Sequence, residues 1–387
     1  MEWRLYPLDV WFFRGTAPMN AGESIVGESH FPPWPEVIQG FVRTALLVAL
    51  GVPLDVYGQA VRGNVHAIPE DVQRAFDLVG RGSYDTGQVD IRGPYIICQL
   101  ASGDVERWFP APLDVYPSDD GQWHAIAPAD PVECDLGTVR LLSPPLQGND
   151  APTGKWISQR GLSHYLREEP IPYEHVKGET EFYAMEPRIG IARDAATRTA
   201  QEGMLYSRQF VRLRESLQDN VAERTGIGVQ VTGVDEGLQL ACAGVHRFGG
   251  EGRLTDVEVH RGQGPAFPSP LPASAYRLLL LTPARWHGSW LPKGSQQADG
   301  GWRVAFGGVH TTAVSAALGK PVRIGGWDLV NRRSKPAVAC IPAGSVYYLR
   351  TDNPDEVAGL HDRKLDGIPG SGFGHALIGQ WNEGGTP

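Results

Sequence analysis

RLYPLDVWFF, residues 4–13, predicts the first strand of the protein. Apolar side chains recur in it at every second position, which is the period of a half-buried β-strand. These positions are Tyr6, Leu8, Val10 and Phe12. A loop follows, and FPPWP at residues 31–35 then introduces a helix whose first residue is expected to be Pro35. A strand, a long loop and a helix in this order are typical of the start of a βαββαβ unit.

The helix that begins at Pro35 carries apolar residues at helical spacing, which predicts one face buried on a sheet. They are Val37, Ile38, Phe41, Val42, Ala45, Leu46, Ala49 and Leu50. The segment 83–185 is rich in proline, glycine and aromatic residues, which predicts short strands and long loops inserted in the first domain. Residues 200–206 fit a helix or an extended segment, and both remain open.

Strand-like patterns resume in the second half of the chain, so we predict an α+β protein with two related βαββαβ cores. The boundary is expected near Thr225, which divides the chain into residues 1–225 and 226–387. The second domain then carries the glycine-rich segment HRFGGEGRL, residues 246–254.

The charge distribution excludes a protein that is basic all over. The net charge is −9, yet 29 of the 35 basic residues are arginine, whose planar guanidinium suits phosphate and base recognition. A GC-rich genome would produce the same excess of arginine. The clustering is more informative, because residues 188–214 hold six arginines and only two acids. A local positive stripe on an acidic protein fits the binding of one polyanion in one place.

Four widely spaced cysteines, without a C-x-x-C pair, argue against a zinc site and a disulfide framework. Apolar runs are too short to span a membrane, and the first residues lack the pattern of a secretory signal, so we expect a cytoplasmic protein without membrane contact. The familiar catalytic signatures are also missing, among them the P-loop, G-x-S-x-G and H-E-x-x-H. We therefore expect no enzymatic activity, no metal and no cofactor.

Three glycines in four positions distinguish HRFGGEGRL. Without a Cβ, Gly249, Gly250 and Gly252 allow phosphate oxygens to approach their amides, and Arg247 and Arg253 would add charge-assisted hydrogen bonds. Glu251 should turn away from a phosphate or bond a sugar hydroxyl. The alternative is an ordinary hairpin loop.

Several motifs, taken in order, resemble one family. They are YPLDVWFFRGTAP with SHFPPWPEVIQGFVRTALL, PRIGIARDAATRTAQEGMLYSRQFVRL (187–213), GGEGR (249–253), GGWDLVNRRSKPAVACIPAGSVYYL (325–349) and GFGHALIGQW (372–381). Together they resemble the Cmr-complex subunit three family of type III-B CRISPR systems, within the RAMP superfamily. The motifs span the chain from end to end, and the proline-rich middle matches only loosely.

The resemblance implies two ferredoxin-like (RRM-like) RAMP folds side by side, with long Pro/Gly-rich insertions. It implies a non-catalytic subunit that caps the 5′ tag of the crRNA, next to a backbone RAMP subunit and the large palm-domain subunit. Contact with the target RNA is then indirect. Single-stranded RNA is held by phosphate contacts and by stacked bases, and Tyr206 and Phe210 are candidates for stacking.

The RNA-binding residues expected from these motifs are Arg14, Arg188, Arg193, Arg198, Arg247, Gly249, Gly250, Gly252, Arg253, Phe373 and Gly374. Two alternatives stay open. RAMP relatives include metal-independent endoribonucleases, so His30, beside the first helix, is a candidate acid or base if a cation such as Arg43 lies near it. The chain could also be a scaffold that contacts only protein.

Overall fold

The first strand is shorter than RLYPLDVWFF suggests. In the computed structural model, β1 (Glu2–Pro7) buries Trp3 and Leu5 completely. The strand ends at Pro7, whose nitrogen has no hydrogen to donate to a ladder. Leu8, 55% exposed, therefore lies beyond the strand.

The first helix agrees with the prediction. Helix α1 (Pro35–Ala49) starts at the expected proline and buries most of the predicted apolar stripe. Its Phe41 ring lies 4.8 Å from the ring of Phe248, so the helix also packs on the start of the glycine-rich segment. Within the described residues, no single helix is long and apolar enough to cross a membrane; α1 and α2 (Leu54–Val61) meet that test only as a pair bent by 114°.

The structure describes residues 1–15, 26–82, 85–134, 137–142, 153–194, 196–214, 222–262, 264–298, 300–328, 331, 333–366 and 370–383. The chain forms two compact units. Unit 1 contains residues 1–105, 180–262 and 324–337, and unit 2 contains residues 106–179, 263–323 and 338–387. The boundary expected near Thr225 falls inside a strand of unit 1, so each unit is assembled from three segments and not from one half of the chain.

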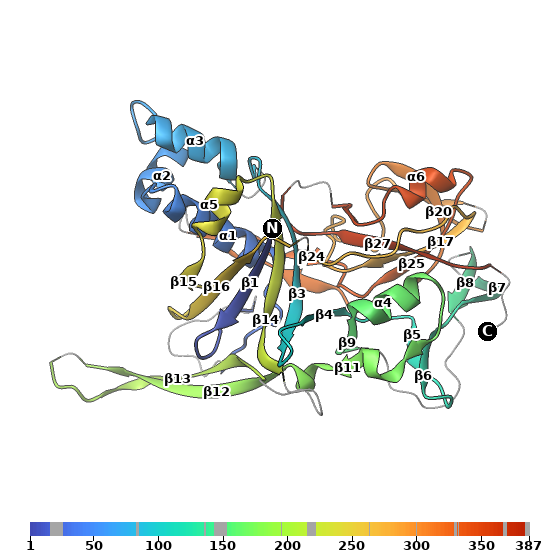
Figure 1. Cartoon of the computed structure of the whole chain (residues 1–387), viewed down its shortest axis with the longest axis horizontal. Helices are drawn as coiled ribbons and strands as arrows, with labels where there is room; N and C mark the ends of the chain where they lie inside the picture. Colours follow the sequence, from blue (N-terminus) through green and yellow to red (C-terminus); the bar gives the residue numbers. More distant parts are fainter. Residues whose placement is uncertain are drawn as a thin grey trace. The chain divides into compact units, whose positions relative to one another are not determined.

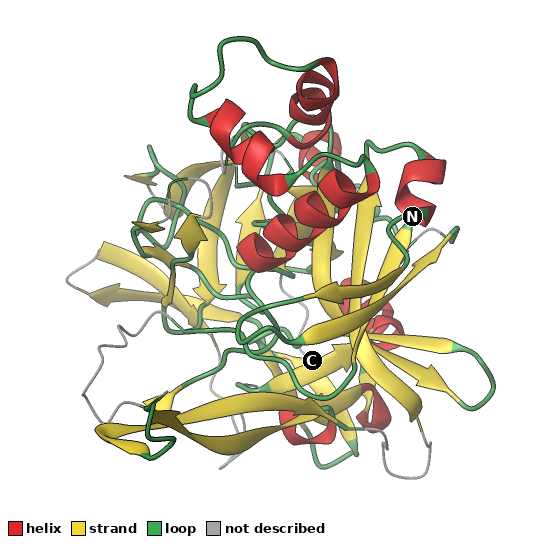
Figure 2. Cartoon of the chain, turned by 90° about the vertical axis from the view of Figure 1, so that its left-hand side faces the viewer, coloured by secondary structure: helices red, strands yellow, loops and turns green. Residues whose placement is uncertain are grey.

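Unit 1 is built on antiparallel strands in the order β3-β14-β1-β16-β15. Helices α1 and α5 pack against β3 and β16, and Figure 2 shows the helices gathered beside the strands. The further elements of the unit are α3 (Glu70–Val79), β2 (Val26–Gly27), β3 (Asp90–Leu100), β12 (Tyr183–Arg193), β13 (Ala200–Leu213), β14 (Ala222–Thr232), α5 (Glu236–Leu240), β15 (Gly244–Arg247), β16 (Leu254–His260), β22 (Trp327–Asp328) and β23 (Arg333–Ser334).

Glycine in β14 makes room for an aromatic ring on the sheet. A Cβ on Gly228 would lie 2.1 Å from Cε2 of Tyr95 on the neighbouring strand. The phenol of Tyr95 donates to Oε1 of Glu2 at 2.7 Å, which fixes the ring over the glycine. Gly228 is therefore needed for packing between strands and not for a turn.

Unit 1 carries a long β-hairpin. Strands β12 and β13 pair antiparallel from Tyr183↔Leu213 outward, and in Figure 1 they run beyond the other strands of the unit. We call residues 183–213 the arm. Residues 200–206, for which the sequence fits either a helix or an extended segment, belong to strand β13 and are extended.

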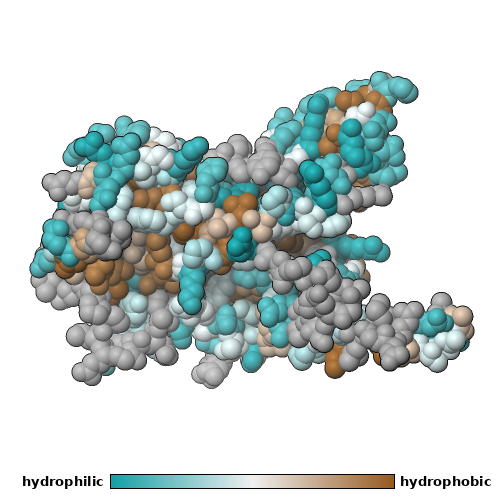
Figure 3. All heavy atoms as spheres, turned by 180° about the vertical axis from the view of Figure 1, so that it is seen from behind, coloured by the Kyte–Doolittle hydropathy of each residue, from teal (hydrophilic) through white to brown (hydrophobic). Residues whose placement is uncertain are grey.

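The arm is attached at its base. Trp11 and Val211 exchange two backbone hydrogen bonds of 3.0 and 2.8 Å, and the rings of Phe12 and Phe210 lie 5.4 Å apart. The arm's outer half keeps apolar side chains at the surface, and Figure 3 shows brown surface among the polar residues there.

Unit 2 contains a seven-stranded antiparallel sheet in the order β18-β19-β20-β25-β17-β27-β26. Its core includes Tyr276, Leu278, Phe306 and Tyr347. The elements are β4 (Val105–Pro110), which begins on the last residue of unit 1, β5 (Val115–Pro117), β6 (Gln122–Ala125), β7 (Pro128–Cys134), β8 (Gly137–Leu142), β9 (Lys155–Ser158), α4 (Gln159–Leu166), β10 (Ile171–Pro172), β11 (Val176–Gly178), β17 (Ala275–Leu280), β18 (Gln296–Ala298), β19 (Gly301–Phe306), β20 (Val309–Ala317), β24 (Val338–Cys340), β25 (Val346–Arg350), α6 (Pro354–Ala358), β26 (Arg363–Lys364) and β27 (His375–Gln380). Strand β21 (Val322–Ile324) lies where the chain passes back to unit 1.

A buried carboxylate joins the segment 106–179 to this sheet. Asp114 has no exposed surface and accepts hydrogen bonds from the phenols of Tyr165, at 3.0 and 2.9 Å, and Tyr348, at 2.7 Å. Arg277, only 2% exposed, places its guanidinium 4.7 Å from the centre of the Tyr165 ring. Of the predicted insertion 83–185, residues 106–179 thus belong to unit 2, whereas residues 83–105 and 180–185 belong to unit 1.

Candidate nucleic-acid interface

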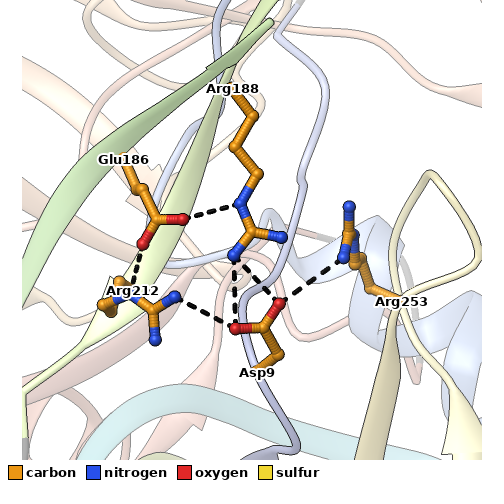
Figure 4. A network of polar contacts seen from close by, with 5 residues as sticks. All are labelled: Asp9, Glu186, Arg188, Arg212 and Arg253. Atoms are coloured by element: carbon orange, nitrogen blue, oxygen red, sulfur yellow. Dashed lines mark hydrogen bonds and ion pairs between the residues drawn. The ribbon is translucent and has the colours of Figure 1, made fainter. Parts of the chain in front are cut away.

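Five charged side chains meet beside the base of the arm (Figure 4). They are Asp9, Glu186, Arg188, Arg212 and Arg253. Oδ2 of Asp9 lies 2.9 Å from Nη2 of Arg188 and 3.6 Å from Nη1 of Arg253, and Oδ1 lies 3.0 Å from Nη2 of Arg212. Three guanidiniums from three strands or loops therefore converge on one carboxylate.

Glu186 connects the two arginines of the arm. Its carboxylate accepts from Nε of Arg188 at 2.6 Å and from Nε of Arg212. These bonds outweigh the effect of partial burial and lower the pKa of Glu186 to about 2, with Arg212 contributing most. Burial alone would raise the pKa of Asp9, but hydrogen bonds from Arg188 and Arg212 hold it below its usual value. Both carboxylates are therefore ionised at neutral pH.

A fourth arginine pairs with the glycine-rich segment. Arg208 forms an ion pair with Glu251, and its guanidinium lies 4.7 Å from the centre of the Tyr206 ring and 5.7 Å from that of Phe12. Glu251 thus turns toward the arm. We call Arg188, Arg208, Arg212 and Arg253 the arginine cluster.

Aromatic rings lie under these guanidiniums. The guanidinium of Arg253 lies 4.4 Å and that of Arg188 lies 5.3 Å from the centre of the Phe210 ring, and both are close enough for cation–π contact. Phe210 is only 4% exposed, so its expected role in stacking a base is not supported. Tyr206, 42% exposed, keeps an accessible ring.

The glycine-rich loop packs on the chain itself. The amide of Gly250 donates to the carbonyl of Phe12 at 2.8 Å, and a Cβ on Gly249 would lie 2.5 Å from the same oxygen. These two glycines therefore allow the close approach of residues 12–13, and the Gly250 amide, expected to bind phosphate, donates to the Phe12 carbonyl instead. Gly252 has a φ of 63°, and a Cβ there would meet no atom within 4 Å. Arg247 is exposed. Close packing on residues 12–13 therefore does not account for these two residues.

The other predicted arginines lie apart from the cluster. Arg193 and Arg198 are exposed at the tip of the arm, where Nε of Arg193 donates to the Arg198 carbonyl at 3.2 Å. Arg14 is exposed and forms an isolated β-bridge with Ser29. The predicted set is therefore distributed over a base, a tip and a strand end.

The last motif is part of a core. Phe373 has no exposed surface, and the guanidinium of Arg285 lies 3.9 Å from the centre of its ring. The amide of Gly374 donates to the Pro283 carbonyl at 2.8 Å, and a Cβ there would lie 2.8 Å from Asp366. Both residues are buried in this structure, so the prediction that Phe373 and Gly374 bind RNA gains no support from it.

The comparisons decide the family. A family model described as CRISPR-associated protein (Cas_Cmr3) matches residues 3–381. The chain belongs to the Cas_Cmr3 family. This confirms the resemblance to subunit three of the type III-B Cmr complex.

Solved structures and curated proteins add little to the Cas_Cmr3 assignment. A chain in the cryo-EM structure of type III-B Cmr-beta bound to cognate target RNA and AMPPnP is 17% identical, with a TM-score of 0.49 over 90% of this chain and 86% of that chain. A Cmr-beta structure bound to cognate target RNA gives 0.48 with the same identity and coverage. The crystal structure of a Csm3-Csm4 subcomplex of the type III-A interference complex gives 0.38 at 10% identity over 99% of both chains. No curated protein is significantly similar in sequence.

In this Cas_Cmr3 protein His30 is poorly suited to acid–base chemistry. Its ring stacks on Trp34, with 3.5 Å between ring centres, and burial lowers its pKa to about 4. Arg43, the cation expected beside it, instead donates to the carbonyls of Gly80 and Gly82. Within the described residues, no group of three or more His, Cys, Asp or Glu side chains could hold a metal ion.

No motif in the sequence singles out Asp9, Glu186, Arg208 or Arg212 as site residues. Arg208, Phe210 and Arg212 stand at alternate positions, which would have placed them on one face of a strand. The sequence of residues 200–206 fits a strand or a helix, and in a helix this spacing would not place the three side chains on one face. The partner Asp9 is 203 residues from Arg212, and no local pattern connects them.

Proposed function

We propose that this Cas_Cmr3 protein is a non-catalytic, crRNA-binding subunit of a type III-B CRISPR effector complex in antiviral defence. It caps the 5′ tag of the crRNA and bridges the large palm-domain subunit to the backbone subunits. It meets the target RNA only indirectly. The arginine cluster is the observation that carries the proposal.

The chemistry of the cluster supports RNA as the ligand. Four guanidiniums gather on one face of the arm and the adjoining loop, on a protein whose net charge is −9. Arginine recognises phosphate through paired hydrogen bonds, and phosphate contacts supply most of the affinity for single-stranded nucleic acid. Tyr206 offers an exposed ring beside them. Arg14, Arg193, Arg198, Arg247 and Gly252 extend the proposed RNA path.

Strand order supports two ferredoxin-like domains. In unit 1, the strands β1, β3, β14 and β16, taken in chain order with other strands between them, pair in the order β16-β1-β14-β3, the arrangement of a βαββαβ unit. In unit 2, β17, β20, β25 and β27 pair in the matching order β27-β17-β25-β20.

The reverse face of the arm suits a protein partner. Side chains alternate between the faces of a strand, so Ile189 and Ile191 lie opposite Arg188. They are 75% and 48% exposed. Exposed apolar residues grouped in this way mark contact surfaces, which supports assembly with other subunits.

Photocrosslinking of the assembled complex tests the function. A crRNA with a photoreactive base in its 5′ tag should crosslink to residues 188–214 or 246–254, and a crRNA carrying the same base at its 3′ end should not. If neither segment is labelled by the 5′ probe, the chain is a scaffold that contacts only protein and the proposal is wrong.

A further inference from the structure

The carboxylate of Asp9 occupies the centre of a site shaped for a phosphodiester. It presents two oxygens and one negative charge to Arg188, Arg212 and Arg253. A phosphodiester presents the same number of non-bridging oxygens and the same charge, and guanidiniums bind both groups in the same geometry.

The cluster is incompletely satisfied by its own acids. Four arginines face three carboxylates, those of Asp9, Glu186 and Glu251. Nε of Arg208 and Nε of Arg253 are buried without a hydrogen-bond partner. Arg253 reaches Asp9 only at 3.6 Å, beyond hydrogen-bonding distance. The cluster therefore carries more positive charge than its own acids neutralise, and a further anion would balance it.

Asp9 and Glu186 differ in how firmly they are held. Glu186 stands on β12 between the Nε atoms of Arg188 and Arg212 and is bound to both, which orients the two side chains. Asp9 lies two residues beyond the end of β1, next to the exposed Leu8, and its own side chain is 48% exposed. Asp9 can turn toward solvent without disturbing a strand.

We propose that Asp9 holds the place of one RNA phosphodiester, and that a bound strand displaces it from Arg188, Arg212 and Arg253. The inference rests on the proposed RNA-binding function and specifies the position at which one phosphate of the RNA binds. Asp9 keeps the three like charges together in the free protein and competes with RNA for them. Glu186 remains in place and positions two of the arginines.

Replacing Asp9 should strengthen RNA binding. One charge pair at about 4 Å in water is worth about fivefold in affinity, so D9N should bind single-stranded RNA about fivefold more tightly at low salt. One further neutralised phosphate should also make the log–log salt slope more negative by about 0.7. E186Q makes the same change in charge, but it removes the carboxylate that orients Arg188 and Arg212. It should therefore weaken RNA binding.

The experiment titrates a fluorescent single-stranded RNA oligonucleotide with the full chain over a salt series. D9N and D9S are measured together, so that a folding defect in one does not decide the result. The control is D256N, which also removes a carboxylate paired with an arginine, Arg224 at 3.0 Å, on strands β16 and β14 and outside the arginine cluster. It should change affinity less than twofold.

The outcomes separate the two levels of the proposal. If the wild type binds RNA but D9N and D9S bind equally or less tightly, or if D256N or E186Q strengthens binding to the same extent, displacement of Asp9 is refuted and RNA binding stands. If the wild type shows no salt-dependent binding and the 5′ tag gives no crosslink in the complex, the proposed function fails and the inference fails with it.

Discussion

Removing the carboxylate of Asp114 should weaken unit 2 more than any surface substitution. In D114A the phenol of Tyr165 loses both of its acceptor contacts, and Tyr348 loses the 2.7 Å bond. The guanidinium of Arg277, 2% exposed, loses its attraction to the charge of Asp114 and keeps Glu168 at 3.7 Å. Leaving a buried charge without its counter-charge costs about 3–5 kcal/mol.

Amide hydrogen exchange is the appropriate assay, because a chain with two compact units need not unfold in one step. A loss of about 3–5 kcal/mol should lower the protection of β17 and β25 by about 10²- to 10⁴-fold. The control is D120A in the same segment, whose carboxylate is 46% exposed and pairs with His124 at the surface. It should leave the protection of β17 and β25 nearly unchanged.

A double variant identifies the cause. In D114A/R277M the buried guanidinium is gone, so the two substitutions together should cost clearly less than the sum of their separate effects. If D114A is no worse than D120A, or if the two effects simply add, the buried carboxylate does not hold unit 2 together as argued.

Three further predictions follow from single residues. G228A forces a Cβ onto the fixed ring of Tyr95 and should cost about 1–3 kcal/mol in urea unfolding, whereas G262A, in open space, should be nearly neutral. The pKa of His30 is lowered to about 4, so its contribution to stability is present above the usual value of 6.5 and lost as pH falls toward 4; an NMR titration that finds its ring protonated at pH 6 would contradict this. F373A should cost about 3–5 kcal/mol, seen as a lower melting temperature, without weakening RNA binding of the folded protein; weaker binding at unchanged stability would restore its predicted RNA contact.

Local patterns predicted those parts of the fold that local chemistry controls. The start of α1 at Pro35 follows from a proline that suits the first turn, and its buried stripe follows from helical spacing. The length of β1 was overestimated, because alternation continues past Pro7 while pairing does not. Alternation records which side chains are buried, and here the loop beyond the strand buries Val10 and Phe12 as well.

The candidate site depended on contacts that no spacing records. Arg188 and Arg253 were identified by residue type and motif, but the carboxylate that joins them is 179 residues from Arg188. The glycines near residue 250 were interpreted as bare backbone for a ligand, and the same bareness admits the chain's own Phe12 carbonyl. A glycine-rich segment therefore predicts that another group lies close to its backbone, but not whether that group belongs to a ligand or to the protein itself.

The acids within the cluster account for how an acidic protein can hold RNA selectively. An unpaired set of four arginines would attract any polyanion, and the affinity would fall steeply with salt. If Asp9 competes for these arginines as we propose, free single-stranded RNA gains little affinity from this site alone. A crRNA that neighbouring subunits already hold is present at high effective concentration and can displace Asp9. The D9N variant should therefore gain affinity for free RNA and lose preference for the assembled guide.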